Sequence, residues 1–144
     1  MKNYILLFSI SLLIISCNVR KRDKIADDTA KQLEQALKDT TSVQMIDSAY
    51  NFGKVADGEK VEFSYRFRNT GTKPLLVTNA TASCGCTVPQ KPEKPILPGE
   101  TGIIKVVFDS RNRVGIAHKT ITVTSNAQPG FPELLLAGEV IKKE

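Results

Sequence analysis

Within residues 59–68, apolar and polar side chains alternate strictly from Val61 onward, and this pattern constrains the fold more than any other feature of the chain. The apolar positions of the segment are Val61, Phe63, Tyr65 and Phe67. In an extended chain successive side chains point to opposite faces, so these four share one face. One apolar and one polar face is typical of a half-buried strand in an antiparallel sheet. The pattern therefore predicts such a strand here.

Similar extended segments recur along the rest of the chain. They lie near residues 46–52, 75–82, 103–109, 119–125 and 134–141, with short extended pieces around residue 86. About seven short strands, with turn signals roughly every ten residues, favour an immunoglobulin-like antiparallel β-sandwich. The sequence contains no Trp, and no two of its cysteines are placed to bridge two sheets. We therefore expect a plain sandwich held together by aliphatic and Phe packing.

Turn residues separate the predicted strands. We expect Asn69 and Gly71 to supply left-handed geometry after the first strand described above. Pro98 and Gly99 suit the two central positions of a type II turn, because Pro fixes φ and Gly tolerates a positive φ. The last strand ends in the polar residues 142–144, which we interpret as a charged guard on a sheet edge.

The first seventeen residues resemble the signal of a bacterial lipoprotein. Lys2 precedes a short apolar run that closes with the sequence Leu-Leu-Ile-Ile-Ser-Cys at residues 12–17. The run fits a secretory signal and is too short for a stable membrane span. Its end resembles the lipobox, in which the Cys is acylated and becomes the first mature residue. We therefore expect a signal peptide at residues 1–16 and a lipid on Cys17 that anchors the chain in a bilayer.

Residues 17–44 form the predicted tether and spacer, and residues 45–144 form the predicted immunoglobulin-like domain. Within the spacer, Ala26, Ala30, Leu33 and Leu37 recur at helical spacing, which predicts a short helix. The basic run at residues 20–22 follows the lipidated position, so it suits anionic headgroups better than nucleic acid. No basic stripe meets clustered aromatic residues, and we expect no nucleic-acid partner.

An ordered set of short motifs resembles the bacterial family called domain of unknown function 1573. The set comprises Phe52-Gly53, Gly58-Glu59, residues 67–71, Pro74-Leu75, residues 83–87, residues 98–100, Phe108-Asp109 and Ser125-Asn126. The resemblance covers about residues 46–141. It implies an exported, often lipid-anchored, immunoglobulin-like domain similar to the ASPM, SPD-2 and Hydin type. It implies no chemistry, because the family is defined by its unknown function.

Cys84 and Cys86 are the residues best suited to chemistry. In an extended chain their Cα atoms lie about 6.6 Å apart on one face, near the upper limit for a disulfide. Gly85 lets the backbone close that gap. Three interpretations remain open: a local disulfide, free thiols packed in the core with Ala80, Ala82 and Val88, or a soft-metal site for Cu(I). A structural zinc needs four ligands, and the only histidine, His118, falls on a predicted solvent face.

No catalytic motif accompanies the pair. The sequence holds no nucleophile elbow, no phosphate-binding loop and no histidine placed for a triad, so we expect a chain that is not an enzyme and binds no cofactor. We interpret it as a lipid-anchored binding or scaffolding domain of the cell envelope with an unidentified protein partner. Asn18 follows the lipidated Cys17, which favours the outer membrane, and the run at residues 20–22 lacks the acidic character that directs certain lipoproteins to the cell surface, which favours the periplasmic side. The alternative is a periplasmic thiol-redox or Cu(I)-binding protein that uses Cys84 and Cys86.

Overall fold

The computed structural model describes residues 31, 34–35 and 38–143. The chain divides into two compact units, Met1–Gln35 and Ala36–Glu144. Lys31, Glu34 and Gln35 are helical in the first unit. The predicted signal peptide, Cys17 and most of the predicted spacer lie outside the described residues. Within the described part of the chain, no helix has the length and apolar character needed to span a membrane.

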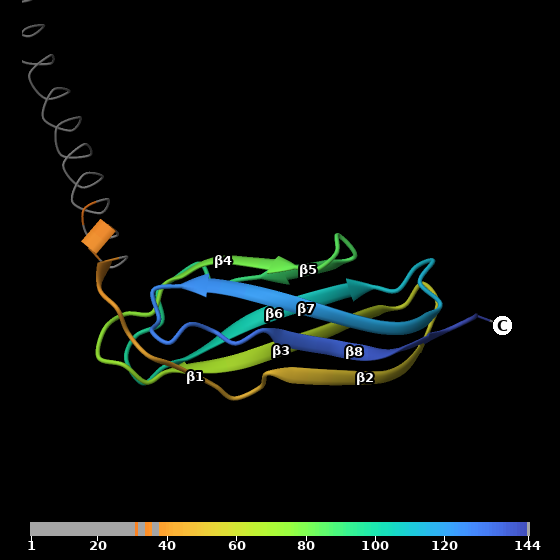
Figure 1. Cartoon of the computed structure of the whole chain (residues 1–144), viewed down its shortest axis with the longest axis horizontal. Coiled ribbons are helices and arrows are strands. Elements are labelled where there is room, and N and C mark those ends of the chain that lie inside the picture. The colour runs from red at the N-terminus through yellow and green to blue at the C-terminus, as the bar shows by residue number, and fades with distance from the viewer. Residues whose placement is uncertain (1–30, 32–33, 36–37, 144) are drawn as a thin grey trace, which may run out of the picture. The chain divides into compact units, whose positions relative to one another are not determined.

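The second unit is a sandwich of two four-stranded sheets (Figure 1). The strands are β1 (Val43–Met45), β2 (Ala49–Ala56), β3 (Lys60–Asn69), β4 (Val77–Ala82), β5 (Thr87–Gln90), β6 (Thr101–Asp109), β7 (Gly115–Ser125) and β8 (Leu134–Ile141). One sheet has the order β1-β3-β6-β5 and the other the order β2-β8-β7-β4. The predicted all-β sandwich is confirmed, with eight strands in place of about seven.

The extra strand is β1, which lies just before the first predicted strand near residues 46–52 and belongs to the other sheet from β2. β1 is antiparallel to β3, whereas β2 is parallel to β8. The chain changes sheets at residues 46–48, where the N–H groups of Ile46 and Asp47 donate to the Arg66 carbonyl. The chain does not reverse its direction as it changes sheets, and β2 therefore pairs with β8 in parallel. The purely antiparallel sandwich predicted from the sequence is therefore wrong at this one pair, and β1 begins two residues before the predicted domain boundary at residue 45.

The core lies between the sheets and is built from the alternation that predicted β3. Tyr65 and Phe67 are fully buried, and Phe63 stacks on Tyr50 with ring centroids 3.9 Å apart. The Tyr65 hydroxyl donates to the Leu135 carbonyl at 2.7 Å and so links β3 in one sheet to β8 in the other. Burial raises the pKa of Tyr65 to about 12. Apolar packing and one buried hydroxyl thus hold the two sheets together.

The turn after β3 differs from the prediction. Neither Asn69 nor Gly71 has a positive φ. Asn69 is instead the fully buried last residue of β3, and its side chain bonds to the loop that follows. Gly71 is required for space, because a Cβ there would overlap the Thr41 side chain. Gly99 does have a positive φ of 83°, and the Glu100 N–H donates to the Leu97 carbonyl at 3.0 Å, as a type II turn at Pro98-Gly99 requires.

The edge strands also differ from the prediction. β8 lies between β2 and β7, so the charged tail that was expected to guard a sheet edge follows a central strand. The four edges are β1 and β5 in one sheet and β2 and β4 in the other. The prediction failed because a charged tail after a strand does not reveal which neighbours that strand acquires.

Candidate functional site

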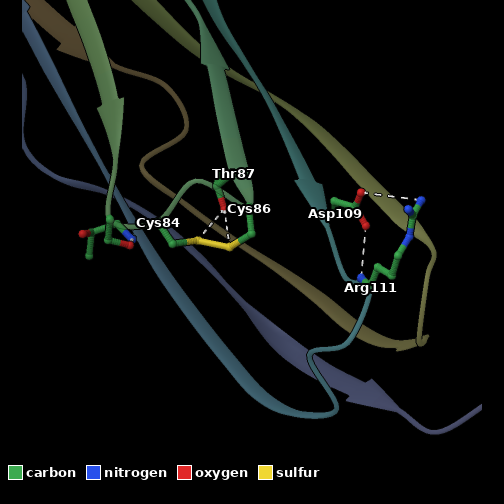
Figure 2. The surroundings of a disulfide bond; sticks show 7 residues. Cys84, Cys86, Thr87, Asp109 and Arg111 are labelled. Atoms are coloured by element: carbon green, nitrogen blue, oxygen red, sulfur yellow. Dashed lines mark hydrogen bonds and ion pairs between the residues drawn. A yellow bond between two sulfur atoms is a disulfide. The ribbon is translucent and has the colours of Figure 1, made fainter.

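The chain changes sheets between β4 and β5, at the predicted cysteine pair. β4 ends at Ala82 in one sheet and β5 begins at Thr87 in the other, so residues 83–86 form the corner between them (Figure 2). On the β4 side, the Ser83 N–H donates to the Thr120 carbonyl at 2.9 Å, and the Thr120 N–H donates to the Ser83 hydroxyl at 3.2 Å. On the β5 side, the Asp109 N–H donates to the Cys86 carbonyl at 2.9 Å. Backbone contacts to both sheets therefore fix the corner.

Cys84 and Cys86 form a disulfide at this corner. Their Cα atoms lie 5.3 Å apart, closer than in an extended chain, because a tight turn brings the Thr87 N–H to the Cys84 carbonyl at 3.2 Å. Free thiols or a Cu(I) site would need two unbonded sulfur atoms, which this arrangement does not provide. The chain also turns here, so the shared face expected for residues 80–88 is not kept, and Val88 is 54% exposed.

The Thr87 side chain contacts both sulfur atoms. Its Oγ1 lies 3.6 Å from the Cys84 Sγ and 3.8 Å from the Cys86 Sγ. Thr87 is only 3% exposed, whereas Cys84 is half-buried and Cys86 is 8% exposed. A buried hydroxyl is thus held beside a disulfide whose Cys84 is partly exposed and whose Cys86 is buried.

An open hollow of about 330 Å³ adjoins the disulfide. It is lined by Gly85, Cys86, Asp109, Arg111 and Arg113. Figure 2 shows Asp109 and Arg111 at the end of β6, across from the corner. The Arg111 N–H donates to the Asp109 carboxylate at 3.0 Å, and the Arg111 guanidinium lies 3.9 Å from it. Two arginines and one aspartate therefore line the hollow.

The loop that carries the two arginines is tied to the neighbouring turn. Ser110 is fully buried, its N–H donates to the Glu59 carbonyl and its hydroxyl donates to the Ala56 carbonyl, both at 3.1 Å. The Asn112 N–H donates to the Asp57 carboxylate at 2.7 Å. Sequence reasoning missed the arginines because only the pairing of β5 with β6 brings this loop beside the cysteines. The polar run after Phe108 indicates a loop, and no local signal indicates its neighbour.

Other candidate ligands lie apart from the corner. His118 is exposed on β7, on the face where the alternation placed it. In the part of the chain that the structure describes, no three His, Cys, Asp or Glu side chains form a group suited to a metal ion. Hydrogen bonds from Arg66 and Lys105 lower the pKa values of Asp47 and Glu62, respectively. Both are surface ion pairs, so these shifts do not indicate a catalytic carboxylate.

A second feature on the same side of the sandwich is the free edge of β4. Thr81 and Ser83 face β7, since Thr81 pairs with Thr122 and the Ser83 N–H bonds to the Thr120 carbonyl. The backbone groups of the alternate residues, Ala80 and Ala82, therefore point away from the sheet. The Ala80 N–H is taken by the Asn79 side chain at 2.9 Å, which leaves the Ala82 N–H facing outward.

The other edges are closed to a further strand by features known to block strand addition. Directly before β5, the Cys86 carbonyl faces β6. The backbone N–H and C=O groups of residues 87 and 89 therefore point away from the sheet. The Thr87 N–H is already bonded to the Cys84 carbonyl, and Pro89 has no N–H group to donate. β2 carries Lys54 and an irregularity in its register between residues 51 and 54, and β1 is three residues long. No charged residue occurs from residue 74 to residue 90, so β4 has no such charge.

Comparison with known families gives one match, to a model described as "Protein of unknown function (DUF1573)" over residues 43–140. No curated protein matches the chain. The resemblance drawn from the ordered motifs is therefore confirmed.

Solved structures with the same fold come from distant proteins. A protein of unknown function from Porphyromonas gingivalis W83 has 18% identity and a TM-score of 0.60 over 69% of this chain and 47% of its own. The ASH/PapD-like domain 7 of human CEP192 has 15% identity and a TM-score of 0.55, over 72% of this chain and 88% of its own. The YadV chaperone has 16% identity and a TM-score of 0.50, over 69% and 52%. These likenesses show a PapD-like or immunoglobulin-like fold, and the chain spans about half the length of the P. gingivalis protein.

Proposed function

We propose, since this chain belongs to the DUF1573 family, that it is a non-catalytic binding or scaffolding domain of the bacterial cell envelope. A lipid on Cys17 holds it in the outer membrane, facing the periplasm. Its partner is a protein that places an extended segment along the free edge of β4. The observation that carries this proposal is the outward-facing, uncharged backbone of that edge.

The chemistry of the edge selects a polypeptide strand as its ligand. The outward Ala82 N–H and the outward carbonyls of Ala80 and Ala82 are groups that the main chain of another strand satisfies, which gives affinity through backbone hydrogen bonds. Natural edge strands are usually short, charged, bulged or interrupted by Pro, because a plain edge invites pairing. β4 lacks charge and Pro, and its register irregularity lies before Asn79, away from the Ala80–Ala82 end. This end is therefore the place where a partner strand pairs.

The proposal is tested by removing the outward donor without disturbing the sheet. Ala82→Pro deletes the N–H that points away from β7 and puts the ring where a partner strand would lie. The bonds from Thr81 and Ser83 to β7 remain. Ala82→Ser is the matched control, because it changes the side chain and keeps the backbone donor.

The readout is cross-linking in cells from a photoreactive residue placed at Thr81, which is exposed on β4. We expect discrete adducts with the parent chain and with Ala82→Ser, and their loss with Ala82→Pro. The same adducts in all three chains would refute strand addition at this edge, and so would the absence of adducts from the parent chain. Circular dichroism of each variant verifies that the sandwich is intact.

A further inference from the structure

We propose that the Cys84–Cys86 disulfide is an exchange site for thiols carried on anionic groups, which enter through the hollow beside Arg111 and Arg113. This activity goes beyond strand binding and rests on different residues. The substrate class is a thiol with a nearby negative charge, whether a small molecule or a cysteine in an acidic peptide.

The disulfide is not needed to hold the corner in place. Hydrogen bonds already fix both sides of it: Ser83 bonds to Thr120 in both directions, and the Cys86 carbonyl accepts from the Asp109 N–H. A bridge across one intervening residue also constrains the unfolded chain very little, because the loop that it closes is so short. The bond can therefore open and close while the fold around it stays the same.

The hollow gives an incoming thiolate access and attraction. Cys86 lines it together with Arg111 and Arg113, and Asp109 is the one acidic side chain among its lining residues. Two arginines and one aspartate give the residues that line the hollow a net positive charge. Positive charge near a disulfide favours thiolates, both the attacking one and the one released. An anionic group on the substrate adds to this attraction.

Thr87 supplies the hydrogen bond that the released sulfur needs. Its hydroxyl is buried and lies 3.6 Å from the Cys84 Sγ. Among the described residues, the two sulfur atoms are the partners of this hydroxyl. When the bond opens, the hydroxyl donates to the Cys84 thiolate, because a buried donor is stabilised by a charged acceptor. Thr87 is thus a positioning residue for the leaving group.

The exchange balances without any further cofactor. A substrate thiolate attacks the Cys86 Sγ, a new S–S bond forms between them, the Cys84–Cys86 bond breaks, and Cys84 leaves as a thiolate. A second substrate thiolate then attacks the substrate sulfur of this mixed disulfide and releases Cys86. Two substrate thiols are oxidised to one disulfide, the protein disulfide is reduced to two thiols, and the two substrate protons end on Cys84 and Cys86.

The test uses the full-length chain with Cys17→Ser, so that only Cys84 and Cys86 can react. Its disulfide is reduced by glutathione, an anionic thiol, and by cysteamine, a cationic one, and the rate constants are compared at equal thiolate concentration and low salt. We expect glutathione to react faster, and salt to reduce its advantage. Arg111→Gln with Arg113→Gln removes this preference. Lys94→Gln, an exposed change in the loop at the other end of β6, leaves it in place.

Thr87→Val tests the hydrogen bond, because Val has the same shape without the hydroxyl. We expect both thiols to react about tenfold more slowly with this variant, and Thr87→Ser to restore much of the rate. Equal rates for the two thiols, an unchanged preference in the double arginine variant, or an unchanged rate in Thr87→Val would each overturn the proposal. Ala82→Pro retains normal exchange, so the failure of strand binding and the failure of exchange are distinguishable.

Discussion

Asn69 provides the sharpest test of how this sandwich is held together at the end where β3 leaves the sheet. Its side chain is fully buried and makes four hydrogen bonds. The carbonyl oxygen accepts from the Thr41 hydroxyl at 2.9 Å and from the Gly71 N–H at 3.1 Å. The amide group donates to the Lys73 and Ile96 carbonyls at 2.8 and 2.9 Å. One side chain thus connects the β3–β4 loop, the segment before β1 and the segment before β6.

The structure sets the size of the effect expected from Asn69→Ala. Both carbonyls that lose the amide donor have another partner: the Thr41 hydroxyl, 3.0 Å from the Lys73 carbonyl, turns to it once the Asn69 oxygen is gone, and Ile96 still accepts from the Leu75 N–H. The variant therefore loses hydrogen bonds without leaving these carbonyls unsatisfied. Four bonds at about 1 kcal/mol each, with a small cavity, destabilise the domain by about 3–5 kcal/mol. That is a large part of the stability of a typical domain.

Urea unfolding followed by circular dichroism measures this loss, with Asn51→Ala as the control. Asn51 is exposed and its side chain makes one bond, to the Gly53 N–H, so we expect a change of about 0.5 kcal/mol. Asn69→Asp turns the amide donor into a carboxylate oxygen facing two carbonyls, so it destabilises more than Ala at neutral pH. A loss below about 1 kcal/mol for Asn69→Ala, or Asp tolerated as well as Asn, would refute the reasoning.

Three further predictions concern the core, the pH dependence and the anchor. Gly138→Ala puts a Cβ into the Phe52 ring and lowers the free energy of unfolding by about 1–3 kcal/mol, measured by thermal denaturation; an unchanged midpoint contradicts it. Because the pKa of Tyr65 is raised from 10.0 to about 12, the unfolded chain loses this proton first, so stability falls as the pH rises across that interval. Tyr65→Phe removes this alkaline fall in urea titrations and lowers the free energy of unfolding by about 1 kcal/mol at neutral pH. An alkaline profile identical to that of the parent chain contradicts the role of Tyr65. Cys17→Ser abolishes the acyl mass and moves the chain from the membrane to the soluble fraction; retention on the membrane excludes the lipid anchor.

The sequence predicted those parts of the fold that depend on local pattern. The alternation in residues 59–68 indicated a strand with Tyr65 and Phe67 inward, and the structure places β3 there with both side chains buried. Pro98 and Gly99 indicated their turn because the required φ values are properties of the two residues themselves. Asn69 and Gly71 carry the same type of turn signal and adopt no left-handed conformation. Their roles come from long-range contacts, a buried hydrogen-bond network and a close approach to Thr41, which no local pattern encodes.

In the candidate exchange site, too, one part follows from the local sequence and the other depends on long-range contacts. Cys84 and Cys86 are separated by one residue, so their ability to bond follows from spacing alone. Arg111 and Arg113 line a hollow with Cys86 because Thr87 is paired with Phe108, which places the loop after β6 beside the residues before β5. In an antiparallel pair, one register position determines which segment lies beyond the end of each strand, and a slip by one residue would also turn every side chain to the other face. The burial of Phe108 fixes that register. The charge around the disulfide is therefore set by core packing several residues away, and the chemistry of the pair becomes specific only once the sheet has formed.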